Sequence, residues 1–180
     1  MIVPQSLAQI YVHIVFATKD RKPRLRGDGL RAELYAYMAT ILRDQVDSPA
    51  IIINGVEDHV HSLIRLSRKF PVMKILQESK SETSKWLKRQ PAVAGDFTWQ
   101  AGYGAFSVSA SMLEEVRKYI QNQQEHHKHM TFQDEFRELC RRHGLELDER
   151  YAWDEGRPVG TPCEAWHLNP GLRQGSRHSP

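Results

Sequence analysis

IIINGVEDHVHSLIRL, residues 51–66, contains the pattern around which the other predicted elements of this chain are arranged. Its two apolar runs flank the polar residues 54–58, a pattern that predicts two strands joined by a hairpin. Side chains of a strand alternate between its two faces. His59 and His61 therefore project side by side from one face of the second strand, with Leu63 and Arg65. The other face is suited to a core and carries Val60, Ser62, Ile64 and Leu66.

Two neighbouring imidazoles on a rigid strand have the spacing to bind one divalent cation together. The H-x-H pattern is a weak signal by itself. The alternative interpretation is a pair of strand histidines that hydrogen-bond to water or to nearby acids. Residues elsewhere in the chain are needed to distinguish a metal site from an ordinary pair of strand histidines.

Periodicity predicts the elements on both sides of this hairpin. Residues 8–17, AQIYVHIVFA, alternate as a strand, and His13 lies on the face opposite Val12 and Ile14. Apolar residues at helical spacing predict helices over residues 29–45 and from Pro71 onward. A further strand is predicted over residues 105–108.

Two more helices follow. Ser111 and Glu114 have the S-x-x-E spacing of a capping box, which predicts a helix over residues 112–125. Residues 131–143, TFQDEFRELCRRH, predict another helix that ends at Gly144.

In chain order these elements predict an α+β fold with a ferredoxin-like or RRM-like βαββαβ core. It consists of an antiparallel sheet with helices, followed by a helix that carries Tyr119 and by one extra helix. Such a core places the first strand beside the third. His13 is therefore expected near His59 and His61, either supporting a metal ligand or making a simple hydrogen bond across the strands.

Composition indicates one domain. The chain has 180 residues, 40% of them hydrophobic and 26% charged, as in ordinary globular proteins. We expect a single catalytic domain over residues 1–153 and a flexible tail over residues 154–180, which are rich in Gly, Pro and Arg without periodicity. No apolar run is long enough to span a membrane and no signal peptide is recognisable, so we expect a cytoplasmic protein.

The formal net charge is only +3, but the basic residues cluster. Residues 19–26 carry five lysines and arginines against one acid, and residues 65–89 carry eight against two. Such clusters can neutralise phosphates, although a merely solvated surface is the alternative. The candidate DNA contacts are Lys19, Arg21, Lys22, Arg24, Arg65, Lys80 and Lys85.

Tyr119 and Gln123 are four residues apart and share one face of the predicted helix. Taken alone, Tyr119 is a packing residue and Gln123 a solvated one. Taken together with His59 and His61, the set contains a metal-binding pair, a candidate third ligand and a phenol nucleophile.

Three motifs, in this order, resemble the TnpA-like single-tyrosine HUH transposases of small insertion sequences, the IS200-like family. They are GVEDHVHSLI (residues 55–64), WQAGYGAFSVS (residues 99–109) and YIQNQQEHH (residues 119–127). The resemblance covers residues 9–153. The segment after Trp153 has no counterpart in it.

The resemblance implies a transposase that cuts and rejoins single-stranded DNA with hairpins. By position, Tyr119 attacks the scissile phosphate and becomes a 5′-phosphotyrosine, while His59, His61 and Gln123 hold Mg²⁺ or Mn²⁺. It also implies a homodimer in which the tyrosine helix of one subunit can complete the site of the other. A phenol with an ordinary pKa near 10 must lose its proton during attack, which a divalent ion on the phosphate facilitates.

Two other functions are open at this stage. A non-catalytic or domesticated single-stranded nucleic-acid-binding protein of the same fold would need exposed aromatic residues on the sheet, for which Tyr11 is the candidate. A metal-dependent nuclease with water as the nucleophile would leave no covalent protein–DNA adduct.

Overall fold

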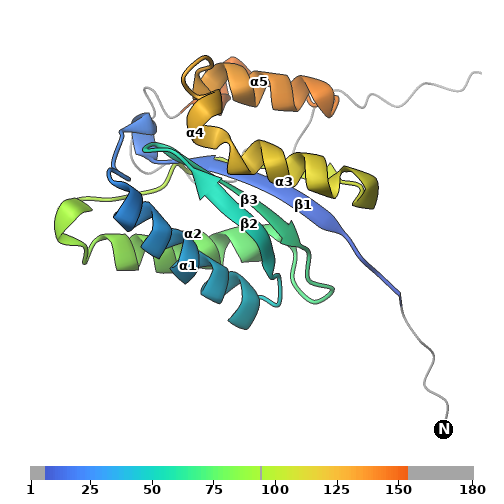
Figure 1. The fold of residues 1–180 in the computed structure, drawn as a ribbon, viewed down its shortest axis with the longest axis horizontal. Helices are drawn as coiled ribbons and strands as arrows, with labels where there is room; N and C mark the ends of the chain where they lie inside the picture. The colour runs from blue at the N-terminus through green and yellow to red at the C-terminus, as the bar shows by residue number, and fades with distance from the viewer. Residues whose placement is uncertain (1–6, 94, 154–180) are drawn as a thin grey trace, which may run out of the picture.

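The computed structural model describes residues 7–93 and 95–153, in which four strands form one sheet between two layers of helices (Figure 1). Along the sheet the order is β2-β3-β1-β4 and all neighbours are antiparallel. This confirms the predicted α+β, ferredoxin-like arrangement. The strands are β1 (Tyr11–Ala17), β2 (Ala50–Gly55), β3 (His59–Arg65) and β4 (Gly104–Val108).

Helices α1 (Asp28–Asp44) and α2 (Val72–Leu87) cover one face of the sheet. The larger core lies between them and the strands, because the alternating residues of β1 and β3 meet the apolar stripes of both helices. Burying such side chains stabilises the fold by roughly 1.5–3 kcal/mol each. The most deeply buried members include Ile14, Leu34, Met38, Val60, Ile64, Ile75 and Leu87.

The opposite face of the sheet is covered by α3 (Leu113–Gln121), α4 (Gln123–His126) and α5 (Phe132–Arg142), drawn above the sheet in Figure 1. Smaller apolar clusters fill this layer, one around Val15, Phe106 and Phe132 and one around Leu63 and Ile120. His59 and His61 are on this face and are fully buried. The remaining elements are the 3₁₀ turns η1 (Lys19–Arg21), η2 (Pro91–Val93) and η3 (Ala110–Met112), and the short helix α6 (Glu149–Ala152).

The register of β1 against β3 decides which polar side chains meet. Val15 pairs with His61, Ala17 with His59, and His13 with Leu63. His13 is therefore the diagonal neighbour of His61 on the same face, within reach of a ring side chain. The predicted adjacency of the first and third strands brings these two imidazoles together.

The predicted helix over residues 112–125 is wrong as a single element. It ends at Gln121, and Asn122 leaves helical geometry (φ −96°, ψ 18°) before α4 begins at Gln123. The predicted capping box is also wrong. Met112 occupies the N-cap position and has no side-chain oxygen to accept a capping hydrogen bond. The Ser111 hydroxyl bonds to the Ser109 hydroxyl, and Glu114 binds the guanidinium of Arg117.

The helix after it begins and ends as predicted. The Thr131 side chain accepts a hydrogen bond from the Asp134 backbone at the start of α5. Gly144 follows the end with φ +64°, a left-handed conformation that favours glycine. The predicted tail, residues 154–180, lies outside the described residues. Among those described, no helix has both the length and the apolar character needed to cross a membrane.

Candidate active site

His59 and His61 of β3 form the floor of the candidate site. His59 Nδ1 donates to Asp58 Oδ1 at 2.7 Å, and His61 Nδ1 shares a hydrogen bond of 2.9 Å with His13 Nε2. Each ring is thereby oriented through its Nδ1 atom. Both Nε2 atoms are buried and, within the described part of the chain, have no hydrogen-bond partner. A pair of oriented, unpartnered imidazole nitrogens is what a metal ion requires.

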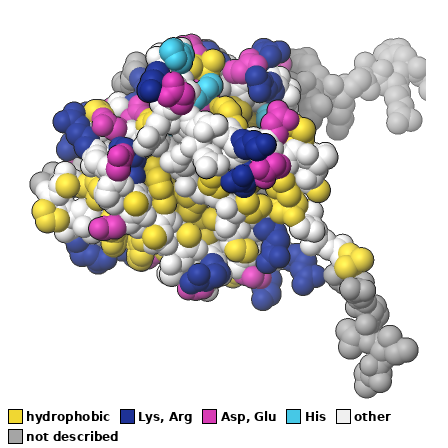
Figure 2. All heavy atoms as spheres, viewed as in Figure 1, with side chains coloured by type: hydrophobic (Ala, Val, Ile, Leu, Met, Phe, Trp, Pro, Cys, Tyr) yellow, Lys and Arg dark blue, Asp and Glu magenta, His cyan; other side chains and the backbone are white. Residues whose placement is uncertain are grey.

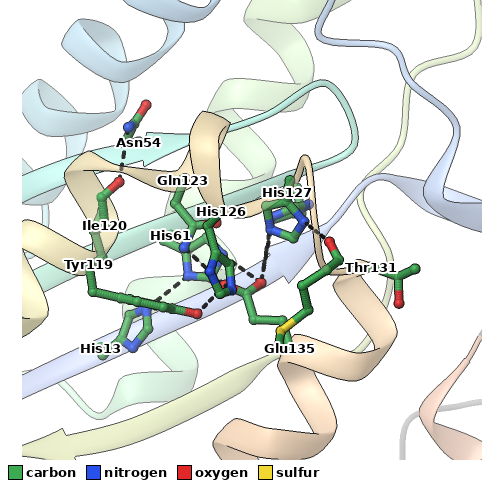
Figure 3. Close-up of polar contacts among 12 residues, drawn as sticks. His13, Asn54, His61, Tyr119, Ile120, Gln123, His126, His127, Thr131 and Glu135 are labelled. Carbon is green, nitrogen blue, oxygen red and sulfur yellow. Dashed lines mark hydrogen bonds and ion pairs between the residues drawn. The ribbon is translucent and has the colours of Figure 1, made fainter.

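Glu135 of α5 is at the centre of the polar contacts (Figure 3). Its side chain is 1% exposed. The Tyr119 hydroxyl and Gln123 Nε2 both donate to Oε1, the amide at 2.9 Å. His127 Nε2 donates to Oε2 at 3.1 Å, and His61 Nε2 lies 3.3 Å from the same oxygen. One buried carboxylate thus joins the tyrosine, the glutamine and the histidines.

No role was assigned to Glu135 or His127 from the sequence, although a signal for Glu135 exists. In TFQDEFRELCRRH it lies three residues after Phe132 and four before Leu139, within the stripe that α5 buries on the sheet. A glutamate is almost never buried without partners. An acid inside an apolar stripe is therefore a mark of a polar site beneath the helix.

Four side chains bring ligand atoms together. The donor atoms of His59, His61, His127 and Glu135 all lie within 4.8 Å of one another. Imidazole and carboxylate are ordinary ligands of divalent metals. This group has the donors and the spacing to hold a metal ion, and the two unpartnered Nε2 atoms fit that role.

The residues predicted from the sequence lie in the same site. Gln123 is fully buried, and its Oε1 atom has no hydrogen-bond partner among residues 7–93 and 95–153. The Tyr119 ring packs edge-on against both His13 and His61, at centroid distances of 6.1 Å. The break at Asn122 does not separate Tyr119 from Gln123, because both reach Glu135.

Burial decides the charge state of His13 and His61. It lowers the pKa of His61 to about 4 and, together with His61, holds the pKa of His13 well below its ordinary value. Both imidazoles are therefore neutral at neutral pH, the form that binds metals. For His127, burial acts to lower the pKa, but the hydrogen bond to Glu135, the Glu135 charge and the Met130 carbonyl together raise it.

The nucleophile candidate holds its proton in this state. Burial and the Glu135 carboxylate raise the pKa of Tyr119 well above its ordinary value. Burial also acts to raise the pKa of Glu135, but the surrounding imidazoles and their hydrogen bonds hold it well below its usual range. The metal-free site thus combines a protonated phenol with an ionised carboxylate acceptor.

A groove of about 510 Å³ leads to this site from solvent. Its lining includes His13, Tyr119 and Glu135, together with Arg142 and His143 at the end of α5. The half-buried phenol is therefore reachable by a substrate.

The predicted DNA contacts are distributed unevenly. The backbone N–H of Leu25 donates to the backbone carbonyl oxygen of Glu57 at 2.8 Å. This contact places the basic loop of residues 19–26 beside the β2–β3 hairpin, next to His59. Arg65 lies at the other end of β3, and Lys85 lies on α2, across the sheet from the site. Basic and acidic side chains are interspersed on the face shown in Figure 2, and histidines reach the surface there.

Lys80 has a different role. Its ammonium donates to the carbonyl oxygens of Gln100 at 2.9 Å and Gly102 at 2.8 Å, and it lies 5.0 Å from the Phe16 ring centroid. These contacts hold the loop before β4, and Lys80 as a DNA contact stays a prediction.

Comparison with known proteins gives the family. The profile of the family described as transposase IS200-like matches residues 6–123. This chain belongs to the IS200-like transposase family. The match ends at Gln123, so His127 and Glu135 lie beyond the matched segment of this transposase. A search of curated proteins found no match.

Two solved structures share the transposase fold. One is named a putative transposase, from Deinococcus radiodurans R1, with TM-score 0.50 and 19% identity over 68% of this chain and 97% of that chain. The other is a REP-associated tyrosine transposase bound to a REP hairpin, with TM-score 0.52 and 9% identity over 71% of this chain and 74% of that chain. At these identities the likeness establishes the fold alone.

Proposed function

We propose that this transposase cleaves and rejoins single-stranded DNA through a 5′-phosphotyrosine at Tyr119, with a divalent metal, Mg²⁺ or Mn²⁺, held by His59, His61 and Gln123. The observation that carries the proposal is the position of the Tyr119 hydroxyl. It donates to Glu135, the same carboxylate that faces His61 Nε2 at 3.3 Å. The phenol is thus held next to the unpartnered imidazoles by groups of a single chain.

In the proposed reaction the Tyr119 oxygen forms a bond to phosphorus while the bond from phosphorus to the 3′ oxygen breaks. The phenol proton leaves along its hydrogen bond to Glu135, and the 3′ oxygen takes a proton from water. The hydroxide left from that water takes the proton from Glu135, which restores the carboxylate. The new phosphotyrosine conserves the phosphodiester bond, so a 3′-hydroxyl can later reverse the step without ATP. A divalent ion bound to the histidines would draw charge from the non-bridging phosphate oxygens.

The partner proposed for this chemistry is hairpin-containing single-stranded DNA. The REP-hairpin complex of a protein with the same fold supports it. We propose that the basic loop beside the site contacts the DNA backbone through Lys19, Arg21, Lys22 and Arg24, with Arg65 and Lys85 as more distant contacts. We also propose a homodimer. Because one chain already brings Tyr119 to His61, each subunit can carry a complete site.

The decisive experiment is a search for a covalent adduct. The protein is incubated with Mn²⁺ and single-stranded DNA from the flanks of its own gene, then separated on a denaturing gel. We expect a protein–DNA band that survives denaturation. Cleavage without such a band would indicate a nuclease that uses water, and binding without cleavage would indicate a non-catalytic binding protein.

The sheet itself argues against the binding-protein alternative. Tyr11, the aromatic residue that would stack on a base, is 9% exposed, and helices cover both faces of the sheet. An RRM-type surface requires an open sheet with exposed aromatic residues.

Cleavage is expected to be confined to single-stranded or hairpin DNA. The scissile phosphate has to enter the groove beside Tyr119, and a paired strand cannot be turned into it without unpairing. Cleavage rates on one labelled sequence, presented as single strand, hairpin and full duplex, measure this. Equal cutting of the duplex contradicts the proposal.

Removing residues 156–180 is expected to leave adduct formation and dimerisation largely unchanged. This segment follows the last described residue, Trp153, and its sequence has no apolar periodicity to bury. Gel-filtration mass and adduct yield of the shortened protein are compared with those of the full chain. A shortened protein that is monomeric or inactive would show that the tail belongs to the folded domain.

A further inference from the structure

We infer that Glu135 and His127 complete the metal site in place of Gln123, so that His59, His61, His127 and Glu135 form a three-histidine, one-carboxylate centre. Tyr119 contacts this centre through the second oxygen of Glu135. The inference deepens the proposed function and rests on it only in naming Tyr119 as the nucleophile. Gln123, with its unpartnered Oε1, stays beside this set.

The distances around Glu135 Oε2 support a shared ion. Three imidazole Nε2 atoms face this oxygen, from His127 at 3.1 Å, His61 at 3.3 Å and His59 at 3.8 Å. Ligand atoms about 2.0–2.2 Å from one ion are roughly 3–4 Å from each other. The three separations between imidazole and carboxylate therefore fall in the range of a coordination sphere, and all four donor atoms lie within 4.8 Å of one another.

The outer contacts of the three rings provide independent support. His59 Nδ1 donates to the Asp58 carboxylate, and His61 Nδ1 bonds to His13. His127 Nδ1 donates to the Met130 carbonyl at 2.8 Å. Metal-binding histidines characteristically use the far nitrogen in this way, which fixes the ring and directs Nε2 at the ion. His127 has the same arrangement as the two strand histidines, although it comes from the loop after α4.

The donor set also predicts which metal is preferred. Three imidazoles and one carboxylate are borderline ligands that suit transition metals, whereas Mg²⁺ prefers oxygen ligands and retains its waters. We therefore expect this site to bind Mn²⁺ more tightly than Mg²⁺.

The two oxygens of Glu135 have different partners. Oε2 faces the imidazoles, while Oε1 accepts from Tyr119 and Gln123. The competing explanation is a purely structural role, in which Glu135 is the buried counter-ion of His127. The two explanations differ in metal affinity, because a structural ion pair predicts lower stability with unchanged binding.

The test is metal binding by the full-length protein without DNA. Metal-free wild type is titrated with Mn²⁺ and the free ion is followed by electron paramagnetic resonance. We expect one tight site that Mg²⁺ displaces poorly, and affinities lower by about 10–100-fold or more for Glu135→Gln and His127→Ala. The matched controls are Glu138→Gln, one turn along α5, and the exposed His129→Ala, both expected to bind as wild type.

Each result decides between the explanations. If folded Glu135→Gln and His127→Ala bind Mn²⁺ as wild type while His61→Ala does not, the inference is overturned and the proposed centre of His59, His61 and Gln123 stands. If wild type binds no Mn²⁺, the inference also fails, and the adduct assay decides separately whether Tyr119 cleaves DNA.

Two further measurements keep the inference testable if Glu135→Gln or His127→Ala fails to fold. Glu135→Asp keeps the charge but withdraws the oxygens by one methylene, so a folded variant with wild-type affinity contradicts the inference. X-ray absorption of the Co²⁺-loaded protein is expected to count three imidazole ligands. A count of two would remove His127 from the set.

Discussion

Replacing Tyr119 with Phe is expected to abolish both the covalent adduct and strand cleavage, while hairpin DNA still binds. No other group takes over, because the attacking oxygen is the atom removed. The ring itself is kept, with its packing against His13 and His61. The measurement is adduct yield on a denaturing gel together with hairpin affinity by a mobility-shift assay.

The same change is expected to lower the stability of the fold. The Tyr119 hydroxyl donates to the buried, ionised Glu135, and a hydrogen bond to a charged group contributes about 1.5–3 kcal/mol. We therefore expect the free energy of unfolding of Tyr119→Phe to fall by that amount, leaving a folded protein.

Tyr103→Phe is the matched control, because Tyr103 is 44% exposed in the loop before β4. It is expected to keep both adduct formation and stability. Wild-type cleavage by Tyr119→Phe would mean that another group or water is the nucleophile, and the transposase mechanism proposed here would be abandoned.

Removal of the metal, or of a ligand to it, is expected to have a comparable effect. His61→Ala should lose cleavage entirely, because it deletes an unpartnered Nε2 that faces Glu135 at 3.3 Å. The fold should survive at a cost of about 1–3 kcal/mol, since His13 loses its hydrogen-bond partner in a buried position. Removing the metal from the wild-type protein with a chelator should abolish cleavage in the same way. Adding Mn²⁺ back should restore cleavage.

Initial cleavage rates on a hairpin substrate, with and without excess chelator, measure the metal dependence. His129→Ala controls for the loss of an imidazole elsewhere, because His129 is exposed. Full cleavage in excess chelator would contradict any metal role, whereas loss of cleavage in His129→Ala would indicate a general effect on the fold.

Several features were predictable from the sequence because they are local. Alternation with a period of two placed His59 and His61 on one face of β3, and the polar break at residues 54–58 predicted the hairpin. The order of elements then required β1 to lie beside β3, which brought His13 to His61. Tyr119 and Gln123 followed from their four-residue spacing and from the resemblance.

The rest depended on how the helices dock. Asn122 interrupts the tyrosine helix, and the Lys80 ammonium turns to the carbonyl oxygens of a distant loop. Neither the helix break nor the Lys80 hydrogen bond is signalled by a local pattern in the sequence. His127 and Glu135 reach the strand histidines only because α5 folds back over the sheet, burying Phe132 and Leu139 against it. The pairing of the strands and the candidate nucleophile could be predicted from local patterns in the sequence and from the resemblance. The position of the Glu135 carboxylate between Tyr119 and His61 depends on tertiary packing. Its partners come from segments that are far apart along the chain, and no periodic pattern in the sequence links them.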